Sequence, residues 1–382
     1  MRTSNTLVVA LSLIFALAVV EGALRVLDIS YPEFNRLDTK YGWTPRPGAD
    51  GWYAFEGRTR FAINQDGFRD IDHAIQKPEG VIRIAVLGDS FTEGREVPLN
   101  KTFWKVMEAR LQDCAPRGNE AFEVLGFGVN GYGAAQELMV LRDKVWKYAP
   151  DAVVLAFFTG NDVVNNEPEL DRHPDRSYYR LENGALVFDD SRQRSADFGR
   201  RKFWTDIKHW FYNRLRTVQV LRQAYLSLKS AYKYRDTPLV DQLNAGLQPE
   251  IYREPSGPWV DAWAVTEALV RQIAREAEEG GADFWLATLG NPIQVTAHEA
   301  LRRKFADSLG VPGLLYPDRR LAKLADTDGL RVVTLVEPLR ATAKSLGQSL
   351  HGSSKFAGGH WNTHGHRAAG EVLAGRICDG YR

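Results

Sequence analysis

The segment Val81–Gly88 is a short apolar run that leads directly into Asp89 and Ser90. Apolar runs of this length, bounded by turn residues, predict buried strands. A serine at the carboxyl end of a parallel strand lies at the sheet edge where α/β proteins place their chemistry. Its hydroxyl needs a base within hydrogen-bond reach, because a serine hydroxyl is a weak nucleophile at neutral pH. The segment therefore nominates Ser90 as a nucleophile, and other parts of the chain must supply the base.

Three further motifs follow in order and could complete a site around Ser90. They are Gly128–Gly131, Gly160–Asp162 and His360–Asn362, the last followed by Gly365 and His366. The first two motifs come directly after predicted strands, so a parallel sheet would bring them to the edge that carries Ser90. Separate turns are the alternative, since glycine and asparagine are common turn residues. The shared position after strands favours a single site.

This ordered set resembles the SGNH hydrolases, also called GDSL-type esterases. The resemblance implies that Ser90 is the nucleophile and His360 the base. It also implies an oxyanion hole formed by the N–H groups of Ser90 and Gly131 and by the side chain of Asn161. Each donor placed around a developing oxyanion is worth about 3–4 kcal/mol of barrier. Gly128 is a rival for the glycine, but the context of Gly131 fits the family pattern better.

One position departs from the family pattern. The family usually has an aspartate two or three residues before its histidine, where this chain has Gly358 and Ala357. Neither side chain can accept the imidazole N–H of His360 and fix its tautomer. Two interpretations stay open. Either a backbone carbonyl orients His360 in a Ser–His dyad, or a carboxylate arrives from elsewhere, with Glu337 after the fifth predicted strand as the candidate orienting group.

Composition and the remaining histidines limit the other classes of site. The net charge of +1 gives no reason to expect a nucleic-acid partner. His364 and His366 lie near His360, but no carboxylate or cysteine joins them at ligand spacing, so we predict no metal and no cofactor. We expect His366 to pack at the start of the last helix, which Asn362 or Thr363 can cap.

Strand-length apolar runs alternate with amphipathic helical patterns along most of the chain. The predicted strands are Arg83–Leu87, Glu123–Phe127, Ala152–Phe158, Asp283–Leu289 and Arg331–Leu335. The predicted helices are Phe103–Gln112, Ala134–Lys147, Val265–Glu279 and Thr363–Ile377. This alternation predicts an α/β fold with three layers, a flavodoxin-like parallel five-stranded sheet covered by helices on both faces.

The N-terminal run Leu7–Val20 follows Arg2 and is apolar except for Ser12. Its length and position are typical of an export signal. We interpret residues 1–27 as a signal peptide or, somewhat more often, a retained membrane anchor. A buried core helix is the alternative, which the extreme N-terminal position disfavours. The rest of the chain is then extracytoplasmic, either periplasmic or on the cell surface.

The remaining chain divides into a lead-in and a hydrolase domain. Residues 28–80 are polar and aromatic, and we interpret them as an N-terminal clasp over the sheet edge. Phe68 and Arg69 could instead line the rim of the site. The resemblance implies an SGNH hydrolase domain over residues 81–382, which we expect to be interrupted by an insertion over residues 165–260 in which the alternation stops.

The insertion is predicted to contain a hairpin over 181–188 and one long helix from about Lys202 to Tyr234. Apolar residues recur in this helix at steps of three or four, and basic residues occupy much of the remainder. A cap helix packed on the domain is the preferred interpretation, and a helix on a membrane surface is the alternative. Because the insertion begins just after Gly160–Asp162, we expect it to overhang the site.

The two cysteines, Cys114 and Cys378, are predicted to form a disulfide. Cys114 follows the first predicted helix, and Cys378 ends the last one. These two helices run in the same direction and commonly cover the same face of such a sheet. Export would permit oxidation. Two thiols that never meet are the alternative.

The sequence therefore favours an exported, membrane-tethered serine esterase. It would remove an acyl group, with acetyl preferred, from a carbohydrate, a cell-envelope substrate or a small ester through a Ser–His acyl-enzyme. One alternative is a polysaccharide O-acyltransferase, in which a sugar hydroxyl captures the same acyl-serine. Another is a non-catalytic polysaccharide-binding or assembly protein on an esterase scaffold, which the missing aspartate supports and the intact Ser90 and His360 oppose.

Overall fold

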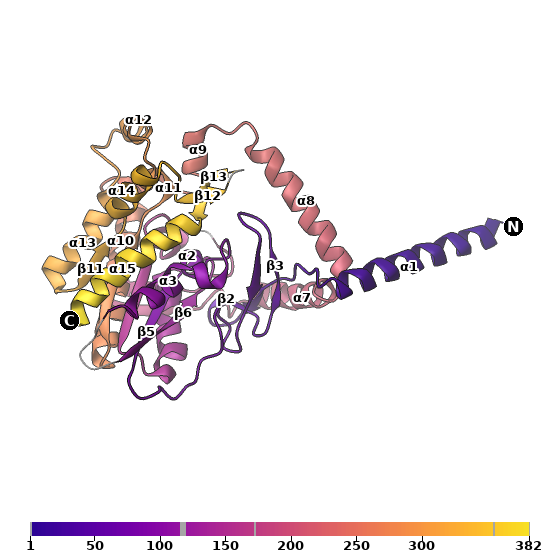
Figure 1. The fold of residues 1–382 in the computed structure, drawn as a ribbon, viewed down its shortest axis with the longest axis horizontal. Coiled ribbons are helices and arrows are strands. Elements are labelled where there is room, and N and C mark those ends of the chain that lie inside the picture. Colours follow the sequence, from indigo (N-terminus) through magenta and orange to yellow (C-terminus); the bar gives the residue numbers. More distant parts are fainter. Residues whose placement is uncertain (1, 115–119, 172, 354–355, 382) are drawn as a thin grey trace.

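The computed structural model describes residues 2–114, 120–171, 173–353 and 356–381 (Figure 1). Its centre is a five-stranded sheet in the order β11-β10-β7-β5-β6, with every neighbouring pair parallel. The strands are β5 (Val81–Gly88), β6 (Ala121–Gly128), β7 (Ala152–Phe158), β10 (Asp283–Leu289) and β11 (Arg331–Thr334). All five predicted strands are therefore confirmed.

Helices cover both faces of this sheet, because its strands are apolar on both sides. Every residue of β7 is buried, as expected for a central parallel strand. One core lies under α3 (Phe103–Leu111), α14 (Val336–Leu346) and α15 (Thr363–Tyr381). The other lies under α4 (Ala134–Val140), α10 (Pro258–Glu279) and α13 (Tyr316–Asp328). The three-layer, flavodoxin-like α/β architecture predicted from the sequence is confirmed.

Helices α3 and α15 lie side by side on one face, although they are far apart in the sequence (Figure 1). Cys114, just after α3, forms a disulfide with Cys378 near the end of α15, across a Cα–Cα distance of 5.7 Å. The bridge closes a sequence separation of 264 residues. The predicted pairing and the helix arrangement behind it are both confirmed.

The N-terminal helix α1 (Arg2–Val26) projects away from the rest of the molecule (Figure 1). Its segment Asn5–Val26 has a mean hydropathy of 2.5, and none of its most apolar window is buried. By length and composition, this segment could cross a bilayer.

Residues 28–80 contain two antiparallel hairpins beside the sheet. The first pairs β1 (Asn35–Asp38) with β2 (Gly42–Pro45), and the second pairs β3 (Asp50–Tyr53) with β4 (Thr59–Ala62). Phe68 is buried against Phe127 of β6, and the buried Arg69 guanidinium donates to the carbonyl oxygens of Glu93 and Val97. Phe68 therefore packs on β6 and Arg69 holds the loop after α2, and neither lines the rim of the site.

The insertion begins with the expected hairpin, β8 (Tyr178–Glu182) and β9 (Ala185–Asp189). The single long helix predicted next is wrong, because the chain breaks between α7 (Ala196–Tyr212) and α8 (Arg216–Tyr234). At the break Leu215 is extended, and the Asn213 side chain accepts the N–H of Glu33, which ties the turn to the lead-in. The short helix α9 (Leu239–Leu243) follows.

The preferred interpretation of this region as a packed cap is also wrong for the apolar face of α8. Gln219 is the buried residue of this helix, while its leucines and tyrosines on the outer side are exposed. Further helices of the described chain include α6 (Pro168–Asp171), α11 (Pro292–Val295) and α12 (Glu299–Leu309).

Candidate active site

Ser90 is the first residue of α2 (Ser90–Glu93), which starts as soon as β5 ends. The Asp89 carboxylate caps this short helix by accepting the N–H of Phe91 at 2.9 Å. Gly88 is required at the turn, since a Cβ there would lie 2.2 Å from the Thr92 hydroxyl. The strand and its tight turn thus fix the serine at the carboxyl edge of the sheet, where it is 6% exposed.

His360 lies on β13 (Phe356–Trp361), which pairs with β12 (His351–Ser353) in a hairpin before α15. Its Nε2 atom is 2.8 Å from Ser90 Oγ, although the two residues are 270 positions apart. The structure therefore brings together the two residues that the sequence nominated as nucleophile and base. A neutral imidazole with its proton on Nδ1 could accept the serine proton through Nε2.

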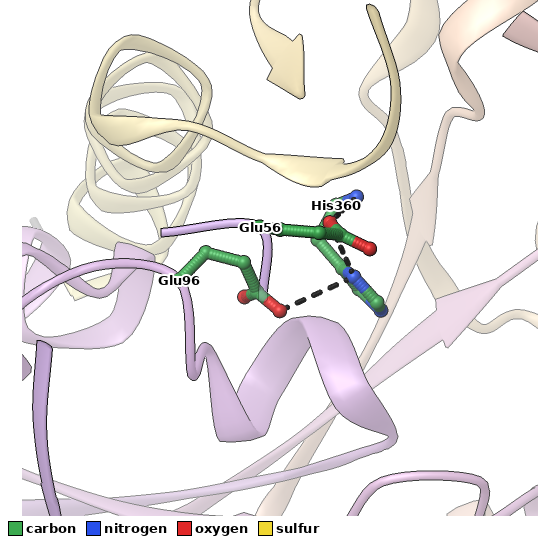
Figure 2. Close-up of side chains that lie close together, drawn as sticks. All are labelled: Glu56, Glu96 and His360. Carbon is green, nitrogen blue, oxygen red and sulfur yellow. Dashed lines mark hydrogen bonds and ion pairs between the residues drawn. The ribbon is translucent and has the colours of Figure 1, made fainter. Parts of the chain in front are cut away.

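Two carboxylates face the other nitrogen of His360 (Figure 2). Glu56 Oε2 lies 3.0 Å from His360 Nδ1 and also accepts the backbone N–H of His360 at 2.8 Å. Glu96 Oε1 lies 3.2 Å from the same Nδ1 atom. Glu56 comes from the β3–β4 turn, and Glu96 from the loop after α2. These acceptors favour the tautomer that leaves Nε2 free for Ser90.

The carboxylate predicted for this role, Glu337, is not there. It lies in the first turn of α14 with its side chain in solvent, and no contact joins it to His360 in the described structure. A backbone carbonyl, the other interpretation, is not the partner of His360 Nδ1 either. The prediction of Glu337 as orienting group is wrong because Glu56 reaches the site from a segment far from it in sequence.

The two glycines before His360 have no room for a side chain. A Cβ on Gly359, which has φ of +84°, would lie 2.5 Å from Glu56 Oε2. A Cβ on Gly358 would lie 1.8 Å from the carbonyl oxygen of Gln242 in α9. Glu56 and Gln242 thus occupy the space that a side chain in the β13 hairpin would need. The Gly358-Gly359 pair was the available signal for such a close approach.

Glu56 is held in place by a second close approach. A Cβ on Gly57 would lie 2.2 Å from the carbonyl oxygen of Glu96, so the two carboxylate-bearing loops touch through backbone. The Thr59 hydroxyl also donates to the carbonyl oxygen of Arg95 at 2.6 Å. The β3–β4 hairpin therefore positions Glu56 through close contact with the loop that carries Glu96.

The three ionisable groups change one another's proton affinity. Burial raises the pKa of Glu56, but hydrogen bonds from His360 outweigh it and lower that pKa overall. Burial, reinforced by repulsion from Glu56 and partly offset by His360, raises the pKa of Glu96 to about 7. Burial alone would lower the pKa of His360, but attraction by Glu96 and Glu56 raises it to about 10. The imidazolium form is thus strongly stabilised.

The predicted oxyanion-hole residues Gly131 and Asn161 follow β6 and β7, the two strands that flank β5. Gly131 lies in the loop after β6 with φ of +77°, and this loop is held by the Trp43 indole, which donates to the carbonyl oxygen of Asn130. Asn161 precedes α5 (Asp162–Asn165) after β7, and its Nδ2 is 3.4 Å from Asp89 Oδ2. The rival Gly128 is needed for packing, since a Cβ there would lie 2.3 Å from the Glu93 nitrogen.

Glu56, Glu96 and His360 also form the group of described residues that could hold a metal, with their ligand atoms within 4.8 Å of one another. Two carboxylates and an imidazole are a donor set that divalent cations use. A cation on Nδ1 would displace the proton that His360 donates to Glu56, and ligand histidines must be deprotonated at the bound nitrogen. The geometry seen is that of an imidazole oriented by hydrogen bonds.

A cavity of about 400 Å³ lies beside Glu56, between the β3–β4 turn, α8, α9 and the β12–β13 hairpin. Aromatic rings and hydroxyl groups share its lining. The residues are Phe55, Tyr234 and Phe356 together with Ser227, Ser230 and Gln242. The insertion therefore overhangs the His360 side of the site, as its position in the sequence predicted.

The other histidine and capping predictions concern the start of α15. Asn362 caps this helix, since its Oδ1 accepts the N–H groups of His364 and Gly365. His366 is fully buried, stacks on Phe103 and accepts the Phe103 N–H at 3.2 Å through Nδ1. Both roles are structural, as expected.

No protein-family model matches the sequence, and no curated protein matches it. The chain is similar in structure to several solved esterases and lipases. They include the lipase Lip_vut3 from a goat rumen metagenome (14% identity, 78% of this chain and 98% of that one, TM-score 0.42). Others are the acetylxylan esterase Axe2 from Geobacillus stearothermophilus (12%, 78% and 94%, 0.38) and a GDSL-like lipase from Bacteroides thetaiotaomicron (12%, 81% and 91%, 0.33). Similarities at these low identities and TM-scores carry no argument about activity, which must come from the residues of the site.

Proposed function

We propose that this protein is a serine esterase of the SGNH type that works through an acyl-enzyme on Ser90. The observation that carries the proposal is the hydrogen-bonded row from Ser90 Oγ through His360 to Glu56, with distances of 2.8 and 3.0 Å. A nucleophile, a base and an orienting carboxylate in one row are the arrangement of serine hydrolases.

In the proposed reaction, Ser90 Oγ attacks the ester carbonyl while His360 Nε2 takes its proton. The carbonyl oxygen becomes an oxyanion, for which we assign the N–H groups of Ser90 and Gly131 and the amide of Asn161 as donors. The C–O bond to the alcohol then breaks, and His360 gives its proton to the departing oxygen. A water molecule, activated by His360, repeats the sequence and releases the acid and Ser90.

We propose an acylated carbohydrate as the substrate, with acetyl the preferred acyl group. Sugar rings present apolar faces and hydroxyl edges, and the cavity beside Glu56 offers aromatic rings next to hydroxyl and amide groups. Its volume of about 400 Å³ is in the range of small-ligand sites. A sugar hydroxyl held there could replace water and give acyl transfer from the same intermediate.

We also propose that α1 anchors the protein in a membrane, with residues 28–382 as its extracytoplasmic part. The support is the exposed apolar segment Asn5–Val26 and a disulfide, which persists in oxidising compartments. A C-terminal alkaline phosphatase fusion should be active, and a fusion active only as a cytoplasmic reporter would contradict the topology.

The test of the enzyme proposal is labelling of the full-length chain in detergent with a fluorophosphonate probe. We expect covalent modification of Ser90, mapped by peptide mass spectrometry, and no labelling of Ser90→Ala. A folded wild-type protein that stays unlabelled while a control serine hydrolase reacts would refute the esterase. Acetate release from acetylated xylo-oligosaccharides, compared with acetyl transfer to unmodified oligosaccharides, then separates hydrolysis from transfer.

A further inference from the structure

Helix α8 carries a strip of large apolar side chains that nothing in the described chain covers. Leu221, Tyr225, Leu228 and Tyr232 follow one another at steps of four, three and four residues, which places them on one side of the helix. Their exposed fractions run from 62% for Tyr225 to 84% for Tyr232. We call these four residues the outer strip.

The opposite side of α8 faces the catalytic domain. Ser227, Ser230, Ala231 and Tyr234 line the cavity beside Glu56. Gln223 donates to the carbonyl oxygen of Ala54 in the lead-in, on this same side. Helix α8 therefore runs between the end of α1 and α9 (Figure 1). One side of it lines the cavity, and the exposed outer strip lies on the opposite side.

The start of α8 is joined to the end of α1. The Glu21 carboxylate accepts the backbone N–H groups of Arg216 and Thr217 at 3.0 and 2.9 Å. The Arg216 guanidinium in turn donates to the carbonyl oxygen of Leu24 at 3.0 Å. If α1 crosses a bilayer, α8 begins where the chain leaves it. With 19 residues, α8 can extend about 28 Å along the surface.

Charge and aromatic content fit the surface of a lipid bilayer. Lys229 lies beside the outer strip and has no acidic partner within the part of the chain that the structure describes, whereas the ammonium of Lys233 lies 4.9 Å from the centroid of the Tyr234 ring. Trp210 and Phe211 are exposed at the end of α7, just before the joint. Cations attract anionic headgroups, and aromatic side chains favour the membrane–water interface.

We propose that the outer strip of α8 lies on the lipid bilayer from which α1 emerges, so that the cavity beneath α8 is held close to the membrane surface. The proposal rests on the membrane anchoring proposed for α1 and is independent of the esterase chemistry. Helix α8 would then have two functions. It lines the cavity beside Glu56, and it makes a second membrane contact that sets the orientation of the site relative to the bilayer. The substrates reached most readily are then acylated saccharides at that surface.

The proposal can be tested with one fluorophore on the full-length chain. Leu228→Cys introduces a free thiol, because both native cysteines are in the disulfide. The thiol is labelled with a polarity-sensitive probe, and the protein is placed in single-copy nanodiscs of phosphatidylethanolamine and phosphatidylglycerol. Leu346→Cys is the matched control, since Leu346 is an exposed leucine on α14, away from α8 (Figure 1).

An interfacial helix buries its apolar side about 5–10 Å into the headgroup and acyl boundary. We therefore expect blue-shifted emission at position 228, and a loss of emission with nitroxide-labelled lipids severalfold larger than at position 346. Equal quenching at the two positions would overturn the proposal. A blue shift at position 228 that is seen in detergent oligomers and is absent in single-copy nanodiscs would also overturn it, because the strip would then contact a second copy of the chain. Ester hydrolysis is not part of the readout, so an inactive protein would leave the proposal testable.

Discussion

Ser90 and Asn161 lie on turns that directly follow β5 and β7, whereas the carboxylates at His360 come from loops outside the sheet. On the serine side, a few consecutive residues encode strand, turn and functional group together. On the histidine side, the geometry depends on contact between segments far apart, with Glu56 and His360 separated by 304 positions. The central sheet positions Ser90, and the loops outside the sheet determine the orientation and the pKa of His360.

The first prediction tests whether Ser90 and His360 both take part in the reaction. Ser90→Ala and His360→Ala should each reduce ester turnover by at least about four orders of magnitude, because each removes an essential partner of the acyl-enzyme step. Initial rates with p-nitrophenyl acetate measure the loss, and unchanged thermal unfolding shows that the variants fold. Residual turnover near the wild-type rate in either variant would place the chemistry elsewhere.

The second prediction compares two glutamates. Glu56→Gln should reduce turnover by about three to four orders of magnitude, since an amide in that place no longer stabilises the imidazolium or its productive tautomer. Glu337→Gln, on the exposed turn of α14, should stay within a few-fold of wild type. Parallel rate measurements decide between them, and the reverse ranking would return the orienting role to Glu337.

The third prediction concerns the disulfide that joins the ends of α3 and α15. Replacing Cys114 and Cys378 by serine should cost up to about 5 kcal/mol of unfolding free energy, because the bridge restricts a very long loop in the unfolded chain. Urea unfolding measures the loss. Turnover at low temperature should be preserved, since the bridge lies at the far ends of α3 and α15. Wild-type protein with two alkylatable thiols would show that the bridge does not form.

The fourth prediction sharpens the histidine side. Turnover needs neutral His360, so activity rises as pH increases through the pKa of that residue. Because Glu96 helps raise the pKa of His360, Glu96→Gln should lower that pKa and move the acidic limb of the pH–rate profile toward lower pH. Profiles of kcat/KM from about pH 5 to about pH 11 measure the shift. Identical limbs in wild type and Glu96→Gln would exclude this coupling.

Chelation provides a control on the same cluster. If hydrogen bonds alone orient His360, dialysis against EDTA should leave turnover within a few-fold of the untreated enzyme, with metal analysis as the check. Activity that disappears with EDTA and returns with a divalent cation would make Glu56, Glu96 and His360 a metal site.

The sequence predicted the parts of this molecule that are encoded locally. The five strands, the turn at Ser90 and the motifs after β6 and β7 each follow from a few neighbouring residues. Glu56 could not be found in this way, because nothing near it marks a hairpin turn as part of a catalytic site. The signal lay instead at Gly358 and Gly359, whose missing side chains leave room for other segments.

The helix over α8 was predicted, but its break from α7 and the exposure of its apolar face were not, for a related reason. Its periodic apolar residues predict an amphipathic helix equally well whether domain or membrane covers them. The break at Asn213–Leu215 depends on a hydrogen bond to Glu33 in the lead-in, which the local pattern of the insertion does not contain.

The most direct test of the central claim is to trap the acyl-enzyme. Wild-type protein is mixed with p-nitrophenyl acetate, quenched in acid within the first turnover and digested for mass spectrometry. The proposed mechanism predicts one acetyl group on the Ser90 peptide of the wild type, and none on that peptide in Ser90→Ala. Ester turnover without an acetyl group on Ser90, or with the acetyl group on another residue, would contradict it.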